Sequence, residues 1–222
     1  MDEIRIGITG LGTVGTGVVS LLTTQEDLIH RRLGVRLRVH RIADRSAHLK
    51  SAAGVPAERL GTDCDALIDD PEVDIFAELI GGIEDARTHI LRAIGRGKPV
   101  VTANKAVLAV HGEEIFDAAE HKVCPVCFEA SVAGGIPIVR NLREAFAADR
   151  LLGLVGILNG TCNYILTEMT EKKTGFDAVL KAAQDQGYAE ANPSFDIDGM
   201  DACHKIAILA NLAYGTPVDV GG

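Results

Sequence analysis

Apolar segments with strand spacing alternate with segments of helical spacing from the start of the chain to about residue 130. Ile4–Ile8 form a short apolar run. Small and apolar residues recur at helical spacing over residues 13–22, and apolar residues alternate with polar ones over residues 35–43. Further strands are predicted at 73–80, 99–103 and 123–130, and further helices at 84–96 and 105–121. Alternation of this kind produces right-handed βαβ crossovers and a parallel sheet covered on both faces. The sequence therefore predicts a doubly wound α/β domain over residues 1–134.

The pattern changes after the glycine-rich stretch at 134–137. Helical spacing recurs at 138–148, 161–171, 176–186 and 200–214, with one apolar strand predicted at 151–158. One strand cannot form a sheet, because its backbone groups stay unpaired. Residues 135–222 are therefore expected to form an incomplete α+β domain.

Composition excludes several classes of protein. The chain has 222 residues and a net charge of −9, which disfavours broad electrostatic binding to nucleic acid. No apolar stretch approaches the roughly 20 residues of a membrane span, and the N-terminus lacks a secretory signal pattern. The five cysteines are odd in number and widely spread, which is not a disulfide framework. We expect a soluble, cytoplasmic protein that binds neither nucleic acid nor membrane.

The first candidate site is Gly10-Leu11-Gly12-Thr13-Val14-Gly15. This G-x-G-x-x-G follows a predicted strand and opens a predicted helix, the context that dinucleotide binding requires. Gly10 permits a tight turn, Gly12 lets the backbone approach a pyrophosphate, and Gly15 allows close packing of helix and strand. A glycine-rich turn without a ligand is the alternative.

The choice between NAD and NADP stays open. Asp44 follows the second strand, where a carboxylate binds the ribose 2′-hydroxyl of NAD. Arg45 comes next and could instead bind the 2′-phosphate of NADP.

Two lysines are candidates for the chemistry. Lys105 follows a predicted strand within Thr102-Ala103-Asn104-Lys105, so it belongs to the edge of the sheet where ligands bind. Asp201 and Lys205 are spaced i, i+4 on a helix that is apolar nearly all round, which predicts a partly buried pair. A solvated lysine and a surface ion pair are the respective alternatives.

Several ordered motifs resemble those of homoserine dehydrogenases. They are G-L-G-T-V-G (10–15), E-L-I-G-G (78–82), T-A-N-K-A (102–106), E-A-S-V-A-G-G-I-P (129–137), N-G-T-C-N-Y-I-L (159–166) and G-Y-A-E with D-I-D-G-M-D-A-C-H-K (187–205). Together they cover essentially the whole chain. The resemblance implies an NAD(P)-dependent oxidoreductase that interconverts L-aspartate 4-semialdehyde and L-homoserine, in threonine, methionine and isoleucine biosynthesis.

The resemblance also implies residue roles. Lys205 matches the family's catalytic lysine, and Lys105 its second active-site lysine beside the cofactor. Glu190, Asp196 and Asp201 match residues that bind the substrate or orient Lys205. The cofactor would contact Gly10, Gly12, Thr13, Val14, Gly15, Asp44, Arg45, Gly81, Gly82 and Lys105. A sodium ion would bind Glu129, Val132, Gly134 and Ile136.

Family members extend beyond the point that matches Gly222, and they are expected to be homodimers at full length. The resemblance therefore covers the nucleotide-binding domain and the first part of the catalytic domain. Two alternatives stay open: a dinucleotide-binding fragment without turnover, and a dehydrogenase of another small amino or hydroxy acid.

Overall fold

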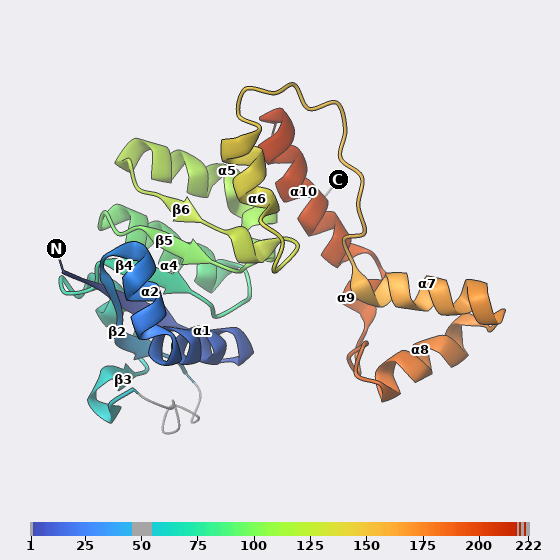
Figure 1. Cartoon of the computed structure of the whole chain (residues 1–222), viewed down its shortest axis with the longest axis horizontal. Helices are drawn as coiled ribbons and strands as arrows, with labels where there is room; N and C mark the ends of the chain where they lie inside the picture. The colour runs from blue at the N-terminus through green and yellow to red at the C-terminus, as the bar shows by residue number, and fades with distance from the viewer. Residues whose placement is uncertain (1, 46–54, 217, 219, 221–222) are drawn as a thin grey trace. The chain divides into compact units, whose positions relative to one another are not determined.

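The computed structural model describes residues 2–45, 55–216, 218 and 220. The chain divides into two compact units, Met1–Gly135 and Ile136–Gly222, which are described separately (Figure 1).

The first unit is built on one parallel sheet. Its strands are β1 (Glu3–Thr9), β2 (Arg36–Ala43), β3 (Leu60–Gly61), β4 (Ile75–Glu78), β5 (Val100–Thr102) and β6 (Val126–Cys127). Their order is β3-β2-β1-β4-β5-β6, and every neighbouring pair is parallel. This confirms the predicted doubly wound sheet, a Rossmann fold. The chain moves outward in opposite directions from β1 and β4, so the crevice between them is where such sheets bind ligands.

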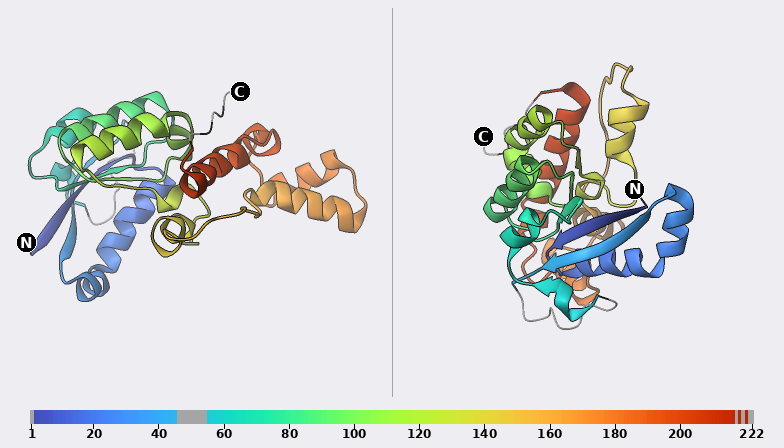
Figure 2. Two further views of the ribbon diagram at one scale, coloured as in Figure 1. Left: turned by 90° about the horizontal axis from the view of Figure 1, so that it is seen from above. Right: turned by 90° about the vertical axis from the view of Figure 1, so that its left-hand side faces the viewer.

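Helices cover both faces of this sheet. They are α1 (Thr13–Thr24), α2 (Glu26–Leu33), α3 (Cys64–Asp69), α4 (Glu84–Gly95) and α5 (Lys105–Lys122), with short η2 (Ala57–Arg59) and η3 (Glu129–Ser131) turns. Figure 2 shows α4 and α5 on the face opposite α1. The inward stripe of α4, including Ile90 and Ile94, is at most 1% exposed, and the strand residues Ile8, Ile42 and Phe76 are fully buried. Burial of these side chains is the main stabilising contribution.

Helix α2 was not expected from the sequence, which predicts neither a helix nor a strand between residues 22 and 35. It has no buried residue, so no apolar stripe reveals it, and it ends at Gly34 in the left-handed conformation with φ 73°. The two-residue strand β3 is likewise too short to produce a period.

The second unit is helical in its described part. It contains α6 (Ile138–Arg140), a π-helical turn η4 (Asn141–Ala145), α7 (Gly160–Lys172), α8 (Phe176–Asp185), α9 (Ser194–Ile197) and α10 (Met200–Tyr214). Helices α7 and α8 bury Ile165, Val179 and Ala183 together with Ala189.

The strand predicted over Leu151–Leu158 is wrong. These residues have no regular secondary structure and form the extended segment between η4 and α7 (Figure 1). An apolar segment becomes a strand only when a second strand satisfies its backbone groups, and the described residues of this unit provide none. Three of its side chains, Leu152, Val155 and Ile157, are mostly exposed.

Within the described residues, no helix combines the length and apolarity that crossing a membrane requires.

Candidate functional site

The glycine-rich loop between β1 and α1 has different constraints at each glycine. Gly10 has φ +92°, and a Cβ there would lie 2.4 Å from the carbonyl oxygen of Leu79. A Cβ on Gly15 would lie 2.0 Å from the carbonyl oxygen of Gly10, so only glycine lets α1 start this close to β1. Gly12 faces open space, with no atom within 4 Å of a built Cβ. The loop thus leaves room at Gly12 beside the N-terminus of α1, where free N–H groups and the helix dipole favour an anion.

A cavity of about 930 Å³ opens next to this loop. It lies at the carboxyl ends of the strands and is bordered by Gly10, Leu11, Gly12, Asp44, Arg45, Thr62, Asp63, Cys64, Asp65, Leu79, Ile80, Asp85 and His89. Cavities of this size hold cofactors and drug-sized ligands. The cavity and the loop together fit a dinucleotide whose pyrophosphate lies at Gly12.

Asp44 and Arg45, the two residues predicted to contact the ribose end of the cofactor, both border this cavity. The Asp44 carboxylate accepts a hydrogen bond from the backbone N–H of Leu11, which ties the end of β2 to the glycine-rich loop. The Arg45 guanidinium is exposed and lies 2.9 Å from Oδ2 of Asp85. An exposed pair of this kind contributes little stability, so the guanidinium can exchange partners at low cost.

Lys105 is the first residue of α5, and its position is set by the residue before it. Asn104 caps the helix by accepting a hydrogen bond from the N–H of Val107. The Asn104 amide donates to the carbonyl oxygen of Gly82 over 2.7 Å. Gly81 and Gly82 both have positive φ, 71° and 76°, so this turn favours glycine at both positions.

In the second unit, Lys205 and Asp201 form a partly buried ion pair on α10. The Lys205 ammonium lies 2.6 Å from Oδ2 of Asp201, and the two side chains are 20% and 6% exposed. The ammonium also donates to the carbonyl oxygen of Leu158 over 2.7 Å. A lysine ammonium has three N–H donors, so two are used here and one can reach a ligand.

Asn159 organises this pair and had no role in the sequence prediction. Its amide donates both to Oδ1 of Asp196 (2.7 Å) and to Oδ2 of Asp201 (2.8 Å). Its side-chain oxygen accepts from the N–H of Cys162, which caps α7. An asparagine directly before a helical pattern predicts such a cap, but its two carboxylate partners lie 37 and 42 residues away. The structure thus brings Asp196, Asp201 and Lys205 together through Asn159.

The remaining predicted residues lie outside this cluster. Glu190 is exposed in the loop after α8, where its backbone carbonyl oxygen accepts a hydrogen bond from the Gln184 amide. Glu129 begins η3, Val132 is buried, and Gly134 is exposed, all near the end of the first unit; the exposed Ile136 begins the second unit.

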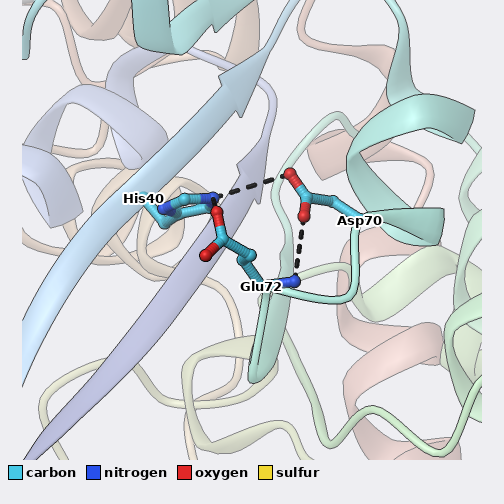
Figure 3. Close-up of side chains that lie close together, drawn as sticks. All are labelled: His40, Asp70 and Glu72. Atoms are coloured by element: carbon cyan, nitrogen blue, oxygen red, sulfur yellow. Dashed lines mark hydrogen bonds and ion pairs between the residues drawn. The ribbon is translucent and has the colours of Figure 1, made fainter.

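A second cluster of polar side chains in the first unit was not foreseen (Figure 3). Nε2 of His40 lies 3.5 Å from a carboxylate oxygen of Asp70 and 3.7 Å from one of Glu72. These three groups are close enough to hold a metal ion, with ligand atoms within 4.8 Å of one another. However, Asp70 also lies 3.2 Å from the Arg41 guanidinium, and Glu72 lies 3.0 Å from that of Arg5. Because guanidinium groups already neutralise both carboxylates, we interpret this as an ion-pair cluster.

The pKa of Asp70 agrees with that interpretation. Burial raises this pKa, but the backbone N–H of Glu72 and the charges of Arg41 and His40 outweigh burial, so the pKa is lowered overall. The cluster precedes β4, whereas the cavity lies after it, so the two are at opposite ends of the sheet.

Comparison with known proteins assigns the chain to a family. Residues 10–129 match the model of the homoserine dehydrogenase NAD-binding domain, and residues 137–221 match the homoserine dehydrogenase model. The chain belongs to the homoserine dehydrogenase family.

Individual homoserine dehydrogenases are similar over nearly the whole chain. The enzyme of Pseudomonas aeruginosa is 48% identical over 218 residues, which are 98% of this chain and 50% of that protein. The crystal structure of a homoserine dehydrogenase from Thiobacillus denitrificans superposes with a TM-score of 0.92 at 50% identity, covering 98% of this chain and 50% of that one. A hyperthermophilic archaeal homoserine dehydrogenase in complex with NADPH has a TM-score of 0.81 at 27% identity, covering 97% and 71%. The chain spans about half the length of the curated relatives it matches.

Proposed function

We propose that this chain carries the nucleotide-binding domain and the Lys205 site of an NAD(P)-dependent homoserine dehydrogenase. The reaction would interconvert L-aspartate 4-semialdehyde and L-homoserine. The observation that carries the proposal is the Lys205 ammonium, held by Asp201 and Leu158 in a family member that also has a dinucleotide-sized cavity.

The first unit binds the cofactor in this proposal. The open space at Gly12 and the crowding at Gly10 and Gly15 fit a backbone that closes around a pyrophosphate. Thr13 and Val14 supply N–H groups at the start of α1, and Gly81, Gly82 and Lys105 follow β4 and β5. When bound, the nicotinamide supplies or accepts the hydride.

The second unit handles the proton. In the reducing direction the Lys205 ammonium donates a proton to the carbonyl oxygen of the aldehyde as hydride reaches its carbon. Asp201 orients the ammonium of Lys205, and Asn159 donates hydrogen bonds to both Asp201 and Asp196. Asp196 and Glu190 bind the substrate, Glu190 through the substrate ammonium, and Lys105 is the second active-site lysine.

We further propose NADP as the preferred cofactor, because Arg45 can bind the 2′-phosphate once it leaves Asp85. Replacing Arg45 with Ala is expected to weaken NADP⁺ binding about tenfold, because the loss of one charged contact costs about 1.4 kcal/mol of binding free energy. Binding of NAD⁺ should be unchanged. Equal affinities of wild type and variant for NADP⁺ would contradict this assignment.

The family resemblance supports four further proposals. These are sodium binding by Glu129, Val132, Gly134 and Ile136, dimerisation of the full-length enzyme, a cytoplasmic location, and a place in threonine, methionine and isoleucine synthesis. Carboxylate and carbonyl oxygens suit such a hard cation. Activity that is unchanged when sodium is replaced by tetramethylammonium would argue against the ion.

The deciding experiment measures NADPH-dependent reduction of L-aspartate 4-semialdehyde, with oxidation of homoserine, malate and related acids in parallel. We expect a clear preference for the homoserine pair, and loss of turnover in Lys205→Ala with cofactor affinity retained. Cofactor binding without turnover would support the alternative, a dinucleotide-binding fragment. Preference for another acid would overturn the substrate assignment.

A further inference from the structure

Glu78 is a fully buried carboxyl group at the carboxyl end of β4, in the centre of the first unit. Glu78 is 0% exposed, so its side chain cannot contact a ligand. One carboxylate oxygen accepts from the Thr102 hydroxyl over 2.6 Å, and the other accepts from the N–H of Ile80 over 2.9 Å. Burying a carboxyl group is costly unless its hydrogen bonds are satisfied, so its presence in the core calls for an explanation.

The hydrogen bonds of Glu78 connect two loops that are distant in sequence. The loop after β4 is held through the N–H of Ile80. The loop after β5 is held through Thr102, whose hydroxyl also accepts from the N–H of Asn104 over 3.0 Å. Asn104 then donates to Gly82 and caps α5, which closes the network. The Gly81-Gly82 turn and the start of α5 at Lys105 are therefore fixed to each other in two ways, through the Glu78 carboxyl group and by the Asn104–Gly82 hydrogen bond.

The network needs a group that only accepts hydrogen bonds. Its partners are donors: the Thr102 hydroxyl and backbone N–H groups of the loop after β4. An ionised carboxylate has acceptors on both oxygens, whereas a glutamine amide places an NH₂ group against one of these donors. Burial raises the pKa of Glu78 overall, although the hydrogen bonds from Thr102 and from the N–H groups of Ile80 and Gly81 oppose that increase.

The position of Glu78 in the sheet indicates which part of a ligand depends on it. In a doubly wound sheet the two mononucleotide halves bind on opposite sides of the switch point, here between β1 and β4. The glycine-rich loop and Asp44, at β1 and β2, belong to the adenosine half and the pyrophosphate. The loops that Glu78 connects follow β4 and β5, on the side of the nicotinamide half.

We propose that Glu78 is a positioning residue, which fixes the Gly81-Gly82 turn and the start of α5 in the geometry that binds the nicotinamide half of the cofactor. This inference rests on the proposed function, because it presupposes a dinucleotide in the cavity. It assigns to the buried Glu78 a role separate from that of the ligand-facing residues.

The test compares binding of a whole dinucleotide with binding of its adenosine half. Isothermal titration calorimetry would measure NADP⁺ and 2′,5′-ADP, with NAD⁺ and 5′-AMP in parallel, on wild type and Glu78→Gln. We expect Glu78→Gln to bind the whole dinucleotide about tenfold more weakly, because one or two contacts from the loops to the nicotinamide half would be lost. Affinity for the adenosine half should be unchanged, since Gly12 and Asp44 are untouched.

Three further variants make the test specific. Glu72→Gln makes the same replacement in an exposed side chain before β4 and should bind both ligands as wild type does. Thr102→Val removes one donor to Glu78 and should weaken binding of the dinucleotide but not of its adenosine half. This variant keeps the test possible if Glu78→Gln fails to fold. Thr102→Ser retains the hydroxyl and should bind the dinucleotide as wild type does.

The outcomes separate the inference from the proposed function. Unchanged dinucleotide affinity in Glu78→Gln and Thr102→Val, or an equal loss for both ligands, would overturn the positioning role alone. A wild-type chain that binds neither ligand would overturn the proposed function, and the inference with it.

Discussion

Removing the charge of Lys205 should destabilise the second unit by an amount that the structure allows us to estimate. In Lys205→Met the apolar stem remains, but Asp201, whose side chain is 6% exposed, loses the ammonium 2.6 Å away. Leaving a buried charge without its partner costs about 3–5 kcal/mol. The cost here should be lower, because Lys205 is 20% exposed and Asn159 still donates to Asp201. We expect a loss of about 2–3 kcal/mol in the free energy of unfolding.

A double-mutant cycle isolates the interaction from the loss of packing. Urea unfolding of wild type, Lys205→Met, Asp201→Asn and the double variant would be followed by far-UV circular dichroism, with the transition of each unit fitted separately because a chain of two units need not unfold in two states. We expect a coupling energy of about 1–3 kcal/mol, as is usual for residues in contact. In the double variant part of the loss should be recovered, since no buried charge remains unpaired.

The refuting result is additivity. If the double variant loses as much stability as the two single variants together, the two side chains do not interact in solution. The ion pair would then not be what orients Lys205, and the account of the second unit would be wrong.

Three further predictions concern the first unit. Gly15→Ala should lower the free energy of unfolding by about 1–3 kcal/mol and abolish dinucleotide binding, because its Cβ would lie 2.0 Å from a backbone oxygen. Gly17→Ala is the matched control: it lies in open space in α1 and should raise stability by about 0.5–1 kcal/mol. Equal Tm and Kd values for the two variants would contradict this prediction. Hydrogen bonds from Arg92 and Arg96 lower the pKa of Asp69 below its ordinary 3.8. The stability that the ionised Asp69 gives the folded state is therefore complete above about pH 3.8 and is lost progressively as the pH falls below 3.8. Thermal unfolding from pH 6 to pH 2.5 should therefore show a shallower decline of Tm for Asp69→Asn, and parallel curves would exclude the effect. Excess Zn²⁺ should raise the Tm of wild type no more than that of Glu72→Gln, and a selective increase would favour a metal site at His40.

The sequence predicts those parts of the molecule in which neighbouring residues determine the structure. The sheet follows from local alternation, and the Asp201–Lys205 pair follows from i, i+4 spacing on one helix. The burial of Ile90 and Ile94 follows from the stripe they share on α4.

The remaining features depend on partners that are distant in sequence. Leu151–Leu158 has the apolar character of a strand, but pairing requires a second strand that no local pattern specifies. Asn159 is recognisable as a helix cap, whereas its bonds to Asp196 and Asp201 become apparent only when α7, α9 and α10 are placed together. No local pattern predicts the burial of Glu78; only the neighbouring strand β5, on which Thr102 is its partner, shows why it is buried.

In the proposed function, this chain binds a nicotinamide dinucleotide, and Lys205 protonates the carbonyl oxygen of the aldehyde as hydride reaches the carbonyl carbon. NADPH carrying deuterium at the transferred position of C4 tests it most directly, with L-aspartate 4-semialdehyde as substrate and mass spectrometry of the product. We predict homoserine with one deuterium on its alcohol carbon from wild type, and no labelled product from Lys205→Ala at equal NADPH occupancy. Unlabelled homoserine from wild type, or labelling by Lys205→Ala at the wild-type rate, would contradict the account.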